Sequence, residues 1–299
     1  MLMCALVYAA PASDPAKRVQ PPVAWSPDVL DAFFDDAREH LVGQRPTASL
    51  AAPRVVVAQN APAVQDNGVF KWSQVVDAET LTAEIKRINN QLATTLRKSS
   101  AFQGGGNLVC RRDFGLLAAL FGVVAEFDDE VRWQSSAAEM QKRCLQACRN
   151  CKTASAQAYA GAKDTHETLV ELLRGQGVGA GETASEQDTL LAERTLLMQV
   201  MELGLQERLS PTLTDKREFR KKTQQAIEQA QVLAVLAKII QHEGYEYTDD
   251  EDYLAEARAL RSASSELSRA AKDKNYEAAR SAAGQVGQSC SRCHEGYRG

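Results

Sequence analysis

The chain ends in the stretch GQSCSRCHEGYRG, residues 287–299, in which two cysteines stand three positions apart with a histidine directly after the second. These residues are Cys290, Cys293 and His294. On a helix, thiols at this spacing are one turn apart, and the imidazole follows on the next position. The end of the chain therefore carries three reactive side chains that can act together on one group.

The Cys-x-x-Cys-His spacing has a specific chemical use. Two thiols one helical turn apart can each add to a vinyl group of haem, and the adjacent imidazole then lies beneath the ring on the iron. A zinc site would need two further ligands, which this end of the chain lacks, and a thioredoxin-like dithiol would need a preceding strand. The motif predicts one covalent haem c, attached to Cys290 and Cys293 with His294 as an iron ligand.

Composition indicates a soluble, all-α protein. The chain has 299 residues, enough for two domains, and its hydrophobic content of 44% is ordinary for a globular protein. Aromatic residues make up only 6%, while residues with high helix propensity are abundant. The net charge of −4 without a basic stripe predicts no nucleic-acid partner. No apolar run approaches the roughly 20 residues of a membrane helix.

Residues 1–14 resemble part of a secretory signal. Met1–Ala10 are apolar, and Ala10-Pro11-Ala12 is a candidate small-residue cleavage site, although the usual positive charge at the start is missing. The alternative is a frayed apolar tail. The signal interpretation predicts export to the periplasm.

Helical patterns divide the chain into two sets. A short helix over 26–42 and a linker to residue 70 precede the first set, which is expected within 72–174. A glycine-rich stretch, GQGVGAGE at 175–182, then marks a domain boundary, and 183–299 form the second set. In the first set, glycines at 104–106 break the chain, and helices are expected over 77–98, 111–127, 132–159 and 162–175.

The second set has its own start and stop signals. Thr183 with Glu186 and Thr248 with Glu251 have capping-box spacing, and Asn275 is a candidate N-cap of the last helix. The expected helices run over 183–209, 215–242, 248–272 and from 275 to near the chain end. The related stretches LAAL at Leu117 and LAVL at Leu233 occupy the most apolar helix of each set. The sequence thus predicts two tandem four-helix bundles.

The second set resembles the cytochrome c′ family over about residues 184–299. Its Cys-x-x-Cys-His lies on the last of four helices, and in CSRCHEGYR an aromatic residue and an arginine follow the histidine at that family's spacing. The stretch ERTLLMQVM, with Arg194 and Met198 four apart, is similar to the family's first-helix pattern. The first set would then be a degenerate, haem-free copy.

The resemblance implies further site residues. Met198 is the implied sixth iron ligand, with Met201 as its alternate, Arg194 suits a haem propionate, and Arg298 suits a position beside His294. From residue types alone, Met198 is equally a core methionine and both arginines are exposed surface residues.

Three cysteines in the first set need a separate account. Cys144, Cys148 and Cys151 share one helical face. Core packing is the first interpretation; a disulfide with Cys110 and a zinc site completed by Cys110 or His166 are alternatives. A second haem at Cys148 and Cys151 is not expected, because the segment that corresponds to the haem helix, 162–175, has no cysteine.

These features together predict a c-type haem protein that transfers electrons in the periplasm. It is expected to be no enzyme, to use a redox partner protein and to be a candidate homodimer. Two alternatives stay open: binding of a small gas such as nitric oxide, and a helical interaction protein without haem.

Overall fold

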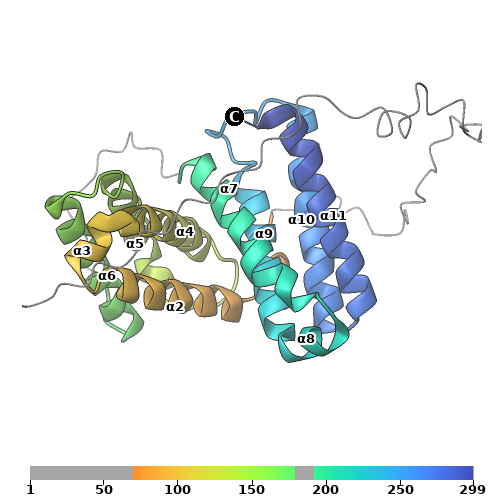
Figure 1. The fold of residues 1–299 in the computed structure, drawn as a ribbon, viewed down its shortest axis with the longest axis horizontal. Coiled ribbons are helices and arrows are strands. Elements are labelled where there is room, and N and C mark those ends of the chain that lie inside the picture. Colours follow the sequence, from red (N-terminus) through yellow and green to blue (C-terminus); the bar gives the residue numbers. More distant parts are fainter. Residues whose placement is uncertain (1–69, 179–191, 299) are drawn as a thin grey trace, which may run out of the picture. The chain divides into compact units, whose positions relative to one another are not determined.

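The computed structural model describes residues 70–178 and 192–298, which form helices joined by short connections (Figure 1). Within these ranges the β pairing is limited to an isolated bridge between Glu243 and Tyr245. The all-α prediction is therefore confirmed for this part of the chain. The predictions for 1–14 and 26–69, and the start of the helix expected at 183, lie outside the described residues.

Helix α4 is the central helix of the first set. The set comprises α2 (Ala78–Thr95), a short helical stretch α3 (Ser99–Ala101), α4 (Asn107–Ala125), α5 (Gln134–Asn150) and α6 (Ala156–Leu173). The predicted break at the three glycines is confirmed, because Gly105 has φ 110°, a left-handed conformation suited to glycine. Thirteen of the 19 residues of α4 are buried, and it packs against α2 and α5. A helix that is apolar nearly all round thus forms the core.

The predicted boundary between the third and fourth helices is wrong. One helix was expected over 132–159, but α5 ends at Asn150 and α6 begins at Ala156. Ser155 caps the new helix, since its side chain accepts a hydrogen bond of 3.1 Å from the backbone N–H of Ala158. Serine is a common N-cap residue, but helical patterns lie on both sides of Ser155, so this helix start is difficult to recognise in the sequence.

The second set also has one more break than the sequence suggests. It comprises α7 (Arg194–Leu203), which continues as a π-helical stretch over Gly204–Leu209, then α8 (Lys216–Lys221), α9 (Thr223–Ile239), α10 (Glu251–Lys272) and α11 (Tyr276–Tyr297). The single helix expected over 215–242 is two, because the backbone at Lys222 leaves the helical region with φ −117° and ψ 22°. Helix α10 packs against both α9 and α11 (Figure 1).

Two helix starts in this set test the capping predictions. Asn275 caps α11 as expected, accepting a hydrogen bond of 3.1 Å from the N–H of Ala278. The capping box at Thr248 is wrong: Asp250 caps α10 by accepting from Asp252 and Tyr253, while the Thr248 hydroxyl donates to the carbonyl of Tyr245. Both residue types are good N-caps, but Asp250 lies two positions later and caps the N–H groups at which the helix actually begins.

The repeated apolar stretches occupy equivalent roles in the two sets. Leu117 and Leu120 in α4, like Leu233 and Leu236 in α9, are at most 2% exposed. Eleven of the 17 residues of α9 are buried. Residues 66–299 form one compact unit, so the division into domains over 72–174 and 183–299 stays a prediction, as does their tandem relation.

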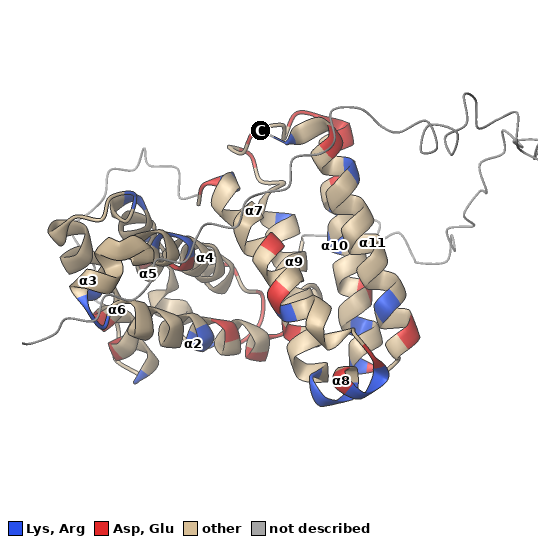
Figure 2. Cartoon of the chain, viewed as in Figure 1, with Lys and Arg blue, Asp and Glu red and all other residues tan. Residues whose placement is uncertain are grey.

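Charged residues of both signs are mixed along the helices (Figure 2). A few of their side chains are buried. Glu84 in α2 is 2% exposed and forms ion pairs of 2.8 Å with Arg87 and with Arg208. Two guanidinium groups therefore compensate the cost of burying one carboxylate. Burial acts to raise the pKa of Glu84, but hydrogen bonds and charge from Arg87 and Arg208 outweigh it and lower that pKa.

Asp113 in α4 lies close to this cluster but lacks comparable compensation. It is 3% exposed, its Oδ2 has no hydrogen-bond partner, and the Nε of Arg112 is 3.8 Å from its Oδ1. Burial raises the pKa of Asp113 to about 7, although Arg112 and Arg87 act in the opposite direction and Glu84 adds to the rise. The folded protein therefore holds a protonated carboxyl at mildly acidic pH.

Asp113 predicts a stability that falls as the pH rises. Between about pH 4 and pH 7 the folded state keeps a proton that the unfolded state releases, so the free energy of unfolding decreases over this window. A difference of one bound proton changes the free energy of unfolding by roughly 1.4 kcal/mol per pH unit, so the protein at pH 8 has lost a few kcal/mol of stability. Asp113→Asn should recover a large part of it, measured by urea unfolding at pH 5 and pH 8.

The matched control for this prediction is Asp164→Asn, at an exposed position on α6. It should follow the wild-type stability at both pH values. If Asp113→Asn also kept the wild-type pH dependence, the folded state would not hold the proton on Asp113.

Candidate haem-binding site

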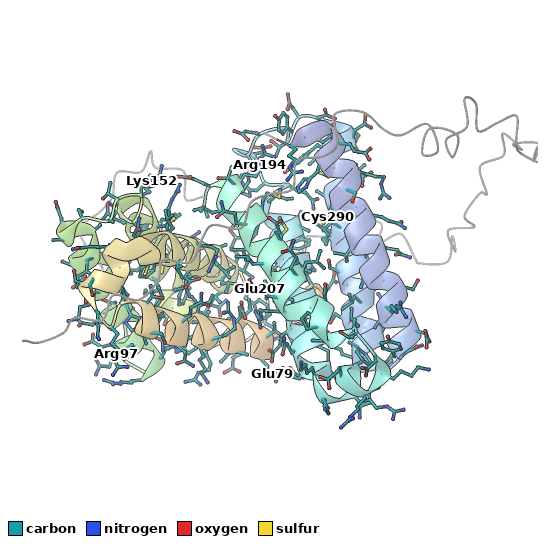
Figure 3. The ribbon with its side chains drawn as sticks, viewed as in Figure 1. Glu79, Arg97, Lys152, Arg194, Glu207 and Cys290 are labelled. Carbon is teal, nitrogen blue, oxygen red and sulfur yellow. The ribbon has the colours of Figure 1, made fainter. Side chains whose placement is uncertain are left out.

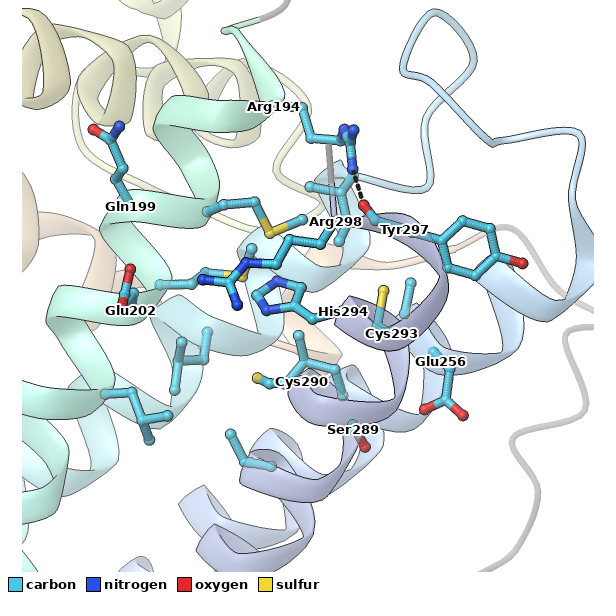
Figure 4. A pocket seen from close by; sticks show the side chains of 18 of the residues that line it. Arg194, Gln199, Glu202, Glu256, Ser289, Cys290, Cys293, His294, Tyr297 and Arg298 are labelled. Atoms are coloured by element: carbon cyan, nitrogen blue, oxygen red, sulfur yellow. Dashed lines mark hydrogen bonds between the residues drawn. The ribbon is translucent and has the colours of Figure 1, made fainter. Parts of the chain in front are cut away.

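The second helical set encloses a cavity of about 420 Å³ that several helices line (Figure 4). This volume falls within the roughly 300–1,000 Å³ typical of cofactor pockets. Residues of α7, α9, α10 and α11 form its walls, and Leu233 and Leu260 contribute apolar surface. Figure 3 shows Arg194 on α7 and Cys290 on α11, two helices far apart in the sequence that both line the cavity.

Helix α11 presents the terminal motif to this cavity. Cys290, Cys293, His294 and Tyr297 all line it, at positions i, i+3, i+4 and i+7, which share one face of a helix. Ala279, Ala282 and Val286, at most 2% exposed, anchor the preceding turns in the core. The predicted haem-attachment residues are thus brought together on a helix that the core and the Asn275 cap hold in place.

The two cysteines of the motif are free thiols. Burial is the main reason that the pKa of each thiol is raised, with the neighbouring Cys293 adding to the effect on Cys290 and Glu256 adding to the effect on Cys293. Thiols rather than thiolates therefore face the cavity at neutral pH. A structural zinc site would need deprotonated sulfur and more ligands. No set of three or more His, Cys, Asp or Glu in 70–178 or 192–298 is arranged to hold a metal ion.

Helix α7 supplies the opposite wall. Arg194, Met198, Met201 and Leu205 line the cavity at a spacing that keeps them on one helix face. Met198 is partly buried, and Met201 is 6% exposed. The cavity therefore has an imidazole on α11 and two thioethers on α7, a donor set that suits haem iron.

The two arginines singled out from the sequence have different surroundings. Arg194 pairs with Glu246, with 2.9 Å between its Nε and the carboxylate Oε2, and its Nη1 donates to the carbonyl of Tyr297 at 3.4 Å. The side chain of Arg298 lies beside His294 at the cavity (Figure 4). Arg298 thus has the predicted neighbour, whereas Arg194 is already engaged with a carboxylate.

Sequence reasoning missed the polar residues that other helices bring to the cavity. Gln199 and Glu202 come from α7, and Glu256 comes from α10. The Nε of Arg292 donates to Oε1 of Glu256 at 2.8 Å, while the buried Oε2 has no partner. No motif marks these residues, because their approach to α11 depends on helix packing.

The cysteines of the first set lie in a different environment. Cys110, Cys144, Cys148 and Cys151 are free and at most 3% exposed. Burial raises the pKa of Cys148 to about 11 and that of Cys151 to about 12. A Cβ placed on Gly115 of α4 would lie 3.5 Å from the sulfur of Cys148, so helix backbone approaches this thiol closely. Tight packing supports the core interpretation and argues against a second haem here.

Comparison with known proteins bears on the second set. Residues 189–298 match the family model described as Cytochrome C'. This part of the chain is therefore similar to the cytochrome c′ family, a class of typically non-enzymatic proteins that carry covalent haem c. Searches of curated proteins and of solved structures found no match to the chain.

Proposed function

We propose that the protein carries electrons in the periplasm by means of one haem c in the cavity of the second helical set. The observation that carries this proposal is the single helix face of α11 that presents Cys290, Cys293 and His294 to a cavity of about 420 Å³. Bound haem supplies a one-electron iron couple and an iron centre able to take axial ligands.

The two cysteines hold the group and His294 ligates it from the α11 side. Because both thiols lie on a well-packed helix, they would hold the group at two points on the cavity wall. Arg298, beside His294, orients the imidazole, as groups next to a ligand commonly do.

Met198 is the proposed ligand from the α7 side. Both methionines line the cavity, but Met198 is partly buried whereas Met201 is 6% exposed, so the flexible side chain of Met198 has more freedom to adjust its position. Histidine and methionine together raise the reduction potential and suit electron transfer. Gas binding needs an open position on the iron. Ligation by Met198 would occupy that position and would therefore favour electron transfer.

The proposal includes export to the periplasm and a redox partner protein that exchanges electrons with this chain. The possible signal segment over 1–14, apolar from Met1 to Ala10, supports export, and attachment of haem to reduced thiols takes place on the far side of a membrane. Among the described helices, none has the length and apolar character to cross a bilayer.

The test is to co-express the full chain with a c-type haem assembly system and to record its visible spectrum, oxidised and reduced. A pyridine haemochrome assay should give one haem per chain, and the reduced protein should have a low-spin spectrum. Absence of covalent haem would overturn the proposal, and two haems per chain would overturn the core interpretation of Cys148 and Cys151.

A further inference from the structure

An exposed tyrosine in the connection between α9 and α10 has a strained backbone. Tyr247 has φ 67°, a left-handed conformation that bulky residues rarely adopt. Its large side chain is 40% exposed. Such strain persists only where neighbouring contacts impose it, and it is concentrated at functional positions. The position of this ring therefore calls for a physical reason.

Three aromatic rings form what we call the tyrosine cluster: Tyr247, Tyr253 and Tyr297. The ring centroids of Tyr247 and Tyr297 are 5.2 Å apart, and those of Tyr253 and Tyr297 are 5.4 Å apart. Tyr253 is fully buried and donates to the carbonyl of Ile240, which anchors the cluster in the core. Since Tyr297 lines the haem cavity, one ring contact leads from the exposed surface to the cavity wall.

A second chain of contacts joins the same surface to the cavity. The guanidinium of Arg194, itself a cavity residue, lies 5.0 Å from the centroid of the Tyr247 ring. The neighbouring Tyr297 side chain is the main reason that the pKa of Asp250, the N-cap of α10, is lowered. Tyr247 is thus held by groups that belong to the cavity and to the start of α10.

The surface around Tyr247 is strongly acidic. Residues 242–252 contain six carboxylates and no lysine or arginine, and Figure 2 shows acidic residues gathered at the start of α10. Arg194 pairs with Glu246 and Arg258 with Glu251, which leaves an excess of negative charge. A like-charged surface, including that of a second copy of this chain, would be repelled.

We propose that Tyr247 and the surrounding carboxylates form the docking surface for a positively charged, one-electron redox protein. The proposal rests on the proposed electron-transfer function and names its kind of partner. In the complex, one electron leaves the ferrous iron of this chain, which becomes ferric, and reduces the oxidised cofactor of the partner. The ring contact between Tyr247 and Tyr297 joins the partner surface to the cavity, and neither tyrosine changes its own oxidation state.

The charge arm of the test uses the haem-loaded full chain and a small, basic c-type cytochrome as the probe. Stopped-flow spectroscopy measures the rate of electron exchange at low and at high salt. Asp249→Asn/Asp252→Asn, at two exposed positions, should slow the reaction about tenfold at low salt and much less at high salt. The same cytochrome with acetylated lysines should lose this sensitivity. The matched control Asp164→Asn/Glu171→Gln, exposed on α6, should retain the wild-type rate.

The aromatic arm uses Tyr247→Gly, which removes the ring and relaxes the positive φ, so that a folding defect is not expected. It should slow exchange with the probe several-fold at both salt concentrations, whereas Tyr247→Phe, which keeps the ring, should not. Reduction by dithionite, a small reductant that needs no docking surface, should be unchanged in all variants.

These readouts distinguish the two proposals. A protein without reducible haem would overturn the proposed function, and the docking surface with it. A protein with normal haem and normal dithionite reduction, but with equal rates in the Asp249/Asp252 and α6 variants, would overturn the docking surface alone.

Discussion

Replacing Cys290 and Cys293 together with alanine is expected to abolish covalent haem attachment. Both thiols line the cavity from one face of α11, and each is expected to form one thioether bond. The measurement is haem staining of the denatured, electrophoresed protein, supported by its intact mass. Since both residues are only partly buried, the variant should retain its helical circular dichroism.

The chain provides a matched control in its other Cys-x-x-Cys pair. Cys148→Ala/Cys151→Ala removes the same number of thiols at the same spacing, and it should keep the wild-type haem content. Haem retained in the Cys290/Cys293 variant and lost in the Cys148/Cys151 variant would move the attachment site to α5 and contradict our assignment.

Replacing Met198 with leucine is expected to convert a low-spin haem protein into a high-spin one. Leucine has a similar volume and keeps the packing of α7, but it lacks the sulfur that we propose as the iron ligand. Covalent haem content should be unchanged, because His294 and both proposed attachment cysteines lie on the opposite wall. Visible and electron paramagnetic resonance spectra would measure the change, together with a fall in reduction potential.

Met201→Leu is the control, since it makes the same change one turn further along the same helix face. It should keep the low-spin spectrum. The reverse result would identify Met201 as the ligand. A wild-type protein that is already high-spin would contradict both assignments and favour the binding of small gases.

Local signals in the sequence predicted some elements well. The Asn275 cap, the break at Gly105 and the face of α11 that carries the terminal motif all depend on residues within one or two helical turns. The family resemblance, first stated over residues 184–299, agrees with the match over 189–298.

Other features depend on competition or on distant contacts and could not be predicted in this way. Ser155 begins a new helix inside a continuous helical pattern, and Asp250 replaces Thr248 as the cap of α10. The burial of Asp113 and the arrival of Glu256 at the cavity both result from packing between helices. The roles of Met198, Arg194 and Arg298 stay predictions.

Helix α7 links the stability of the first set of helices to that of the second. One of its faces lines the cavity, while Leu196 on the other lies against Gly115 of α4, at 3.4 Å from where a Cβ would be. A ligand that binds the native state alone lowers the free energy of every structure that must be intact for binding. The helices of the first set would therefore share thermodynamically in whatever a bound haem contributed, because α7 both packs against α4 and lines the cavity.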